Sequence, residues 1–99
     1  MSAKTITVVA TFQAKSGKEA ELKKVLMTLL APTRKETGCI NYDLHQSPDE
    51  PGKFLFHENW TDKKSLDTHL QSAHVQVLLP RMDELCVGMP EIKIWEKIG

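Results

Sequence analysis

The sequence predicts an α+β domain with the ferredoxin-like order β-α-β-β-α-β. Four segments alternate between apolar and polar residues as strands do, two segments repeat apolar residues at helical spacing, and their order is strand, helix, hairpin, broken helix, strand. We expect one antiparallel sheet with the helices on one face. A length of 99 residues indicates a single domain, spanning residues 1–99.

The composition argues against several classes of protein. Thirteen Lys and Arg balance thirteen Asp and Glu, so the chain has no general attraction to nucleic acid or anionic membrane. Its apolar stretches are far shorter than the roughly 20 residues of a membrane span, and we see no signal peptide. Cys39 and Cys86 are too few for a disulfide framework. We therefore expect a reduced, cytoplasmic protein without a nucleic-acid or membrane partner.

The first strand and helix are predicted from residues 5 to about 38. Residues 5–13 are rich in β-branched side chains and have no strongly polar face, as in a strand covered on both sides. Ser16 and Glu19 have the spacing of a capping box, with Ser16 as the N-cap. Pro32 should kink or end the helix, and Gly38 can stop it. The buried stripe of this helix would consist of Leu22, Val25, Leu26 and Leu29.

The next two strands form a predicted hairpin over residues 39–47 and 53–60, joined by a turn-rich segment. In the first strand, the alternation places three side chains on one face of the sheet, namely Ile40, Tyr42 and Leu44. The opposite face would carry Cys39, Asn41, Asp43 and His45. In the second strand, one face would carry Phe54, Phe56, Glu58 and Trp60.

The C-terminal part predicts a helix in two pieces and a last strand. Asp62 can cap a helix that carries Leu66, His69 and Leu70, and a bend is expected at residues 72–74. A second helical run follows up to Leu85, made imperfect by Pro80, and residues 91–98 alternate as a strand.

The sheet face away from the helices is expected to be apolar enough to need a partner. Val9 lies there, together with Leu55 or Trp95 according to the strand register. Apolar sheet surface of this kind is usually covered, and a second copy packed face to face would cover it. We therefore expect a homodimer formed through the sheet face.

Three segments resemble the antibiotic biosynthesis monooxygenase domain family, in particular its short quinol-monooxygenase-like members. They are residues 38–44, residues 58–62 with their Glu-x-Trp, and residues 66–74 with His-x4-His. The resemblance covers essentially the whole chain and implies a dimeric α/β barrel. It also implies cofactor-independent oxidation of aromatic or quinol-like substrates. Because the family includes haem-degrading enzymes and an isomerase of a phosphorylated sugar, the resemblance does not fix the substrate.

His69 is the best candidate for a general base. The ordinary pKa of histidine, about 6.5, suits proton transfer near neutrality. His69 shares a helical stripe with Leu66 and Leu70 and should point inward, either into a pocket or as a hydrogen-bonded core residue. His74 follows five residues later, about 140° around a continuous helix, so a metal site from this pair is not expected. His74 would instead be a cap or a pocket wall.

Glu58 and Tyr42 complete the predicted catalytic set. A carboxylate among aromatic side chains needs a partner or a raised pKa, so Glu58 could orient a histidine, or form a structural ion pair or dimer contact. Tyr42 could donate to a substrate oxyanion or merely pack in the core. Asn41 and His45 could face the pocket or the dimer interface. The expected substrate-binding residues are Trp60, Asn41, His74, Phe56 and Leu70. Trp60 and Phe56 could instead be core residues.

No cofactor and no metal are expected. The chain lacks a Gly-rich dinucleotide loop, a phosphate loop and a cysteine pair with zinc spacing. Ala10 stands near the position where haem-degrading relatives have an Asn, which makes haem degradation doubtful.

Two classes of function remain open from the sequence. The first is a cofactor-independent monooxygenase, an oxidoreductase that oxidises a small aromatic, quinol or polyketide-like substrate with O₂. The second is a non-catalytic dimeric module that binds a small hydrophobic molecule, for example in a stress response. An isomerase of a small signalling metabolite is a third option, disfavoured because Arg34 and Arg81 are isolated and form no phosphate-binding cluster.

Overall fold

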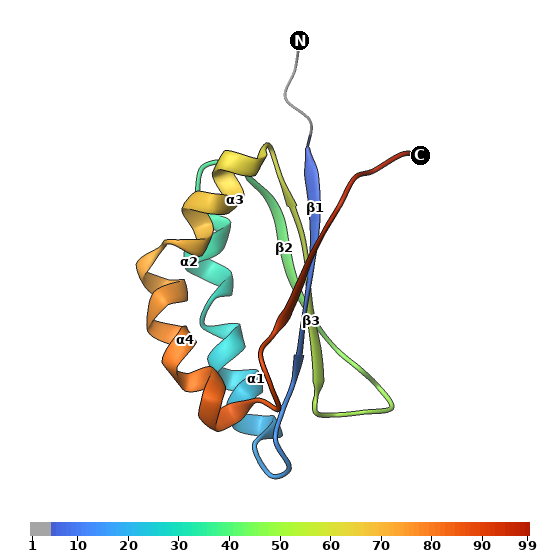
Figure 1. The fold of residues 1–99 in the computed structure, drawn as a ribbon, viewed down its shortest axis with the longest axis vertical. Helices are drawn as coiled ribbons and strands as arrows, with labels where there is room; N and C mark the ends of the chain where they lie inside the picture. The colour runs from blue at the N-terminus through green and yellow to red at the C-terminus, as the bar shows by residue number, and fades with distance from the viewer. Residues whose placement is uncertain (1–4) are drawn as a thin grey trace.

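The computed structural model describes residues 5–99. Its elements follow the predicted order, with each of the two expected helices divided into two pieces (Figure 1). The elements are β1 (Ile6–Gln13), α1 (Glu19–Met27), α2 (Leu30–Arg34), β2 (Cys39–Gln46), β3 (Lys53–Trp60), α3 (Lys63–Leu70), α4 (Ala73–Leu85) and β4 (Glu91–Trp95).

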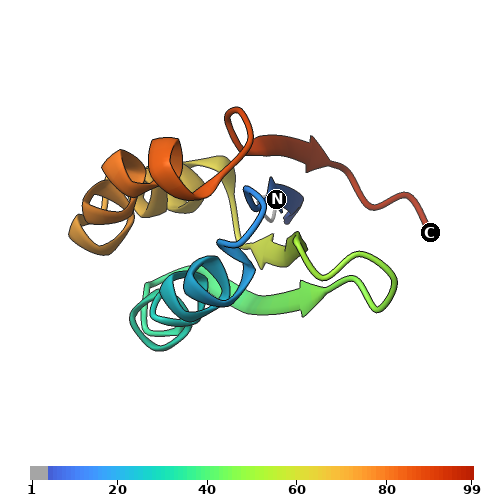
Figure 2. The same cartoon turned by 90° about the horizontal axis from the view of Figure 1, so that it is seen from below.

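The four strands form one antiparallel sheet in the order β2-β3-β1-β4. All four helices cover the same face, with α1 and α2 together over one part of the sheet and α3 and α4 over the other (Figure 2). This is the predicted α+β ferredoxin-like arrangement, and it is confirmed. No helix within residues 5–99 combines the length and the apolar character that crossing a bilayer requires.

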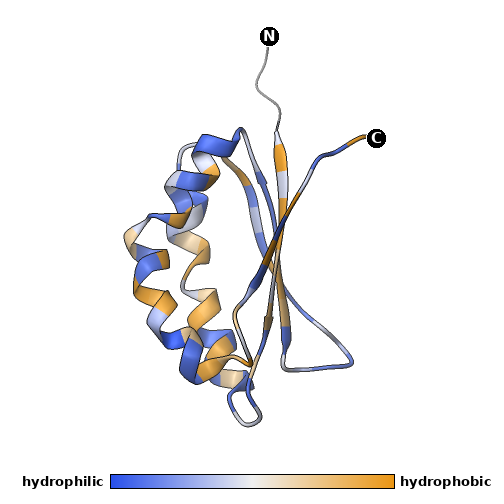
Figure 3. Ribbon diagram, in the orientation of Figure 1, coloured by the Kyte–Doolittle hydropathy of each residue, from blue (hydrophilic) through white to orange (hydrophobic). Residues whose placement is uncertain are grey.

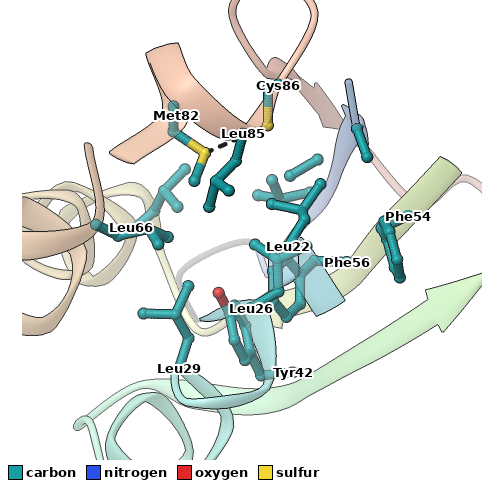
Figure 4. Packing of buried hydrophobic residues seen from close by; sticks show 14 of the residues in the cluster. Leu22, Leu26, Leu29, Tyr42, Phe54, Phe56, Leu66, Met82, Leu85 and Cys86 are labelled. Carbon is teal, nitrogen blue, oxygen red and sulfur yellow. Dashed lines mark hydrogen bonds between the residues drawn. The ribbon is translucent and has the colours of Figure 1, made fainter. Parts of the chain in front are cut away.

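The core lies between the sheet and the helices. Hydrophobic and hydrophilic positions alternate along the helices, as expected for helices with one buried side (Figure 3). The largest fully buried side chains include Trp60 and Phe56 from β3, with Leu22 and Leu26 from α1. Figure 4 shows how Leu66, Met82 and Leu85 of the other helix pair converge on the same region as Leu26, Phe56 and Tyr42.

The start and end of the first helix differ from the prediction. Helix α1 begins at Glu19 with Lys18 as its N-cap, and no side chain caps it, so the capping box at Ser16 is wrong. Gly17 precedes it with φ +85°, a left-handed conformation that glycine adopts without steric cost. The predicted interruption near Pro32 is confirmed, because the helix breaks after Met27 and resumes as α2. Asp62 caps α3 as predicted, its carboxylate accepting from the Ser65 N–H at 2.8 Å.

A bulge at the start of β2 reverses two predicted positions. The register shifts between Cys39, which pairs with Trp60, and Asn41, which pairs with Asn59. Ile40 is the extra residue, and its side chain is 54% exposed instead of lying beside Tyr42. Cys39 turns toward the core, against the prediction. Beyond the bulge, alternation holds as predicted.

The open face of the sheet carries the three apolar side chains considered in the sequence. Val9 pairs with His57, Leu55 with Thr11 and Trp95 with Thr7, so all three project away from the helices. Trp95 is 56% exposed. Strand β4 ends at Trp95, three residues earlier than predicted. The homodimer through this face stays a prediction.

Candidate functional site

A cavity of about 180 Å³ lies between the covered face of the sheet and the helices. Its walls are largely apolar, from Val8 and Phe56 of the sheet to Leu66 and Met82 of the helices. Half-exposed Leu79 and Ile92 mark its mouth, between α4 and the edge strand β4. Three polar side chains reach the cavity: Tyr42, Glu58 and His69.

The imidazole of His69, in the last turn of α3, is held by one hydrogen bond and by contacts with the rings of Trp60, Tyr42 and His74. Its Nδ1 lies 2.7 Å from Oε2 of Glu36, and because a carboxylate only accepts, Nδ1 carries the proton. The imidazole packs on the Trp60 ring, with centroids 4.8 Å apart, and against the edge of Tyr42 at 5.4 Å. In the part of the chain that the structure describes, Nε2 has no hydrogen-bond partner. His69 therefore has an unpaired ring nitrogen and lies in the wall of the cavity.

Burial favours the neutral form of this imidazole. Desolvation lowers the pKa of His69, and the nearby His74 adds to that effect, while the hydrogen bond and charge of Glu36 oppose it. With its proton fixed on Nδ1, neutral His69 has a lone pair on Nε2. That nitrogen can accept a proton from a molecule in the cavity.

Glu58 and Tyr42 lie opposite each other on paired strands and face the same space. Burial raises the pKa of Glu58 from 4.5 to about 7, although the hydrogen bond from Trp60 Nε1 to Oε1, at 2.9 Å, holds it down. The predicted role of Glu58 as the group that orients a histidine falls instead to Glu36. Burial and the charge of Glu58 raise the pKa of Tyr42, so its phenol stays protonated and can donate.

Glu36 is the functional candidate that the sequence did not reveal. It lies between α2 and β2, and the same Oε2 that binds His69 lies 2.8 Å from Nε2 of His74. Its partners are 33 and 38 residues away, so no local motif marks it. The only local signal is its position two residues before Gly38, whose φ of +90° turns the chain into β2.

The remaining predicted residues divide between the cavity and other places. Phe56 and Leu70 line the cavity, whereas Trp60 lies behind His69 and is fully buried. His74 lies outside the lining, on the far side of Glu36. Asn41 lies on the open face, bonded to Asn59 and to the backbone of His57. Five of the eight predicted residues therefore meet at one cavity: Tyr42, Phe56, Glu58, His69 and Leu70.

A larger hollow, of about 470 Å³, lies elsewhere on the molecule. It is bounded by the β2–β3 turn and by the segment before β4, with Leu55, Val87 and Met89 among its walls. None of the eight predicted site residues lines it. We place the candidate chemistry in the smaller cavity, because it brings Tyr42, Glu58 and His69 together in an otherwise apolar wall.

Similar proteins agree with this fold. The antibiotic biosynthesis monooxygenase family model matches residues 5–80. The protein sll1783 of Synechocystis is 31% identical over 92% of this chain, and the chain spans only 62% of its length. "Putative monooxygenase Rv0793" of Mycobacterium tuberculosis is 33% identical over 70% of this chain and 67% of its own.

Solved structures extend the similarity to the whole chain. PA3566 of Pseudomonas aeruginosa superposes with a TM-score of 0.94 at 28% identity, covering 100% of this chain and 99% of its own. The family match covers well over half of the residues, so the chain belongs to the antibiotic biosynthesis monooxygenase family.

Proposed function

We propose that this protein is a cofactor-independent monooxygenase that oxidises a small aromatic, quinol or polyketide-like substrate with O₂. The observation that carries the proposal is the unpaired Nε2 of His69 at an apolar cavity, with Nδ1 tied to Glu36. Family membership, and a relative that carries the name of a monooxygenase, support the same class of reaction.

The proposed chemistry begins with proton transfer to His69. Nε2 takes the proton of a phenolic hydroxyl, and the Glu36 carboxylate stabilises the imidazolium that results. The substrate anion is electron-rich and passes one electron to O₂, and the radical pair then joins through a new C–O bond. The peroxide anion formed in this way takes the proton back from His69 and becomes a hydroperoxide. Loss of water from the hydroperoxide leaves a quinone, so one oxygen atom enters the product and the other leaves as water.

The walls of the cavity favour a neutral aromatic substrate. An apolar cavity of roughly 150 Å³ accepts benzene, so this cavity admits a small ring system. Phe56 and Tyr42 stack at 4.4 Å and offer a flat aromatic surface beside it. Among the described residues that line it there is no Lys or Arg to hold a phosphate, which disfavours a phosphorylated substrate.

The proposal includes a homodimer through the open face of the sheet. Val9, Leu55 and Trp95 project from that face without any helix over them. Burying them against a second sheet would gain about 25 cal/mol for each Å² of apolar surface. Light scattering should give twice the chain mass for the parent, and Trp95→Lys should shift it toward the monomer.

Oxygen uptake tests the reaction directly. Chelator-treated protein, given reduced naphthoquinones without flavin, should consume O₂ and release the oxidised product. We expect His69→Ala to lower the rate by about 10²-fold or more, the usual contribution of a general base, and exposed His45→Ala to leave it unchanged. No uptake across a broad quinol panel, or full activity in His69→Ala, would overturn the proposal. Ligand binding without product would favour the non-catalytic module.

A further inference from the structure

Three side chains from three separate segments meet behind the imidazole of His69. They are Glu36 from the connection before β2, His69 from the end of α3 and His74 from the start of α4. Their ligand atoms all lie within 4.8 Å of one another. We propose that these three side chains form a binding site for a divalent transition-metal ion of the Zn²⁺ type.

The donor atoms select the class of ion. Two imidazole nitrogens and one carboxylate oxygen match the ligands that Zn²⁺ and its neighbours Co²⁺ and Ni²⁺ prefer. Mg²⁺ and Ca²⁺ prefer oxygen ligands throughout and are disfavoured. Three protein ligands leave a fourth tetrahedral position for water.

Solvent can reach this cluster without passing through the cavity. The side chain of His74 is 24% exposed and that of Glu36 is 15% exposed, while His69 is 4% exposed. The exposed members lie at the junction of α3 and α4, whereas the cavity opens between α4 and β4. An ion can thus enter from the helix junction and meet His69 from behind.

Binding requires the three donor atoms to shift from hydrogen-bond spacing to the spacing around a tetrahedral ion. Glu36 Oε2 is now hydrogen-bonded to the two nitrogens at 2.7 and 2.8 Å. Around a tetrahedral ion with ligand distances of about 2.0–2.1 Å, neighbouring ligand atoms are about 3.3 Å apart. The carboxylate must therefore retreat by about 0.5 Å from each ring, and the two ring nitrogens, which lie within 4.8 Å of each other, must approach to about 3.3 Å. Glu36 lies outside the helices and strands, where such a movement meets least resistance.

The break between α3 and α4 makes this cluster possible. In one continuous helix, residues five apart point in different directions. Here α3 ends at Leu70 and α4 begins at Ala73, so the chain turns His74 back toward His69, with ring centroids 5.9 Å apart. The earlier expectation against a metal site assumed a continuous helix and did not include Glu36.

An ion at this site would also control the base of the proposed reaction, an inference that rests on the proposed function. Without metal, Nδ1 carries the proton and Nε2 is the acceptor. A metal on Nδ1 leaves the proton of the neutral ring on Nε2, which then donates into the cavity. His69 could no longer take a proton from the substrate, so the metal-bound protein should be inactive.

Cobalt titration of the full chain tests the site without any substrate. One equivalent of Co²⁺ should produce the visible absorption of a tetrahedral ion, and Zn²⁺ should displace it. Glu36→Gln and His74→Ala should each weaken Co²⁺ binding by at least about tenfold. Exposed His45→Ala should bind as the parent does. Circular dichroism confirms that each variant is folded.

The outcomes separate the two proposals. Equal Co²⁺ affinity in the parent, Glu36→Gln and His74→Ala, or no saturable binding to the parent, would overturn the metal site whatever the activity. A cobalt spectrum that depends on these residues supports the site even if no quinol is oxidised. If quinols are oxidised, addition of one equivalent of Zn²⁺ should abolish oxygen uptake in the parent and spare it in His74→Ala. Uptake that continues in the zinc-loaded parent would overturn the control of the base.

Discussion

The two faces of the sheet use polar side chains in opposite ways. On the covered face, Glu58 and Tyr42 lie among aromatic rings and have few polar partners. On the open face, Thr7, Asn59 and Asn41 bond in series across three strands, at 2.6 and 2.7 Å. Neighbouring residues of one strand thus have different roles. Polar groups that are buried and underpaired become reactive, while those that are paired and near water define strand register.

The largest difference between the faces should appear when one apolar side chain is removed from each. Phe56→Ala should lower the free energy of unfolding by about 3–5 kcal/mol, because Phe56 is 1% exposed and stacks on Tyr42. Its neighbour Leu55 faces the open side and is only partly buried, so Leu55→Ala should cost less than about 1.5 kcal/mol in the monomer. Urea denaturation of the two variants and the parent measures both losses of unfolding free energy.

Protein concentration sharpens this comparison. If a second copy covers the open face, the cost of Leu55→Ala should grow as the concentration rises, whereas that of Phe56→Ala should change little. Equal costs at every concentration would show that the two faces are not energetically different.

The second difference between the two faces is how their acidic side chains make the free energy of unfolding depend on pH. Because burial raises the pKa of Glu58 to about 7, the folded protein keeps a proton that the unfolded chain releases above about 4.5. The free energy of unfolding should therefore fall as pH rises from about 4.5 to about 7, by up to about 3 kcal/mol, and then level off. Glu58→Gln should remove this loss and be more stable than the parent at pH 8.

The matched control lies on the open face. Asp43 pairs with Arg34 at 3.3 Å and is about half exposed, so Asp43→Asn should change stability by less than about 1 kcal/mol. Urea denaturation at pH 4, 6 and 8 distinguishes the variants. A parent whose stability does not decline between pH 5 and 7 would contradict the buried-carboxyl assignment.

A smaller effect is expected from the polar series on the open face. Asn41→Ala removes the bond from Asn59 Nδ2 and the bond to the His57 carbonyl, and should cost about 1 kcal/mol of stability. Oxygen uptake by the folded variant should be unchanged, since Asn41 does not line the cavity. A large loss of activity with normal stability would place Asn41 in the site after all.

The smallest change in stability is expected from Tyr42→Phe. The stacked contact with Phe56 is retained and only the hydroxyl, which interacts with Thr33, is lost, so the free energy of unfolding should change by less than about 1 kcal/mol. Affinity for a phenolic ligand should fall by roughly three- to tenfold if the hydroxyl donates to it. Calorimetric titration measures the change, and equal affinity would assign Tyr42 to packing alone.

Local patterns were enough to predict the fold. The alternation along β3 identified its buried face, and Asp62 marked the start of α3, because both signals depend on neighbours in the chain. The bulge at Ile40 could not be read in this way, since it exists only relative to the partner strand.

The candidate site was only partly predictable. His69 could be identified from its helical stripe, but the partner that fixes its proton, Glu36, lies 33 residues away. The bend before His74 was expected, but its contact with Glu36 joins residues 38 positions apart, and no local pattern indicates it. Tertiary contacts, and not motifs, define this cluster.

The bulge in β2 has a consequence for chain length. Removing Ile40 would leave Cys39 directly before Asn41, and their side chains already point to opposite faces of the sheet. The shortened strand would alternate regularly from its first residue, and Tyr42 would keep its position at the cavity. A strand beside the candidate site can thus lose a residue without disturbing it, and relatives with a one-residue gap at this position are compatible with the same arrangement of side chains around the cavity.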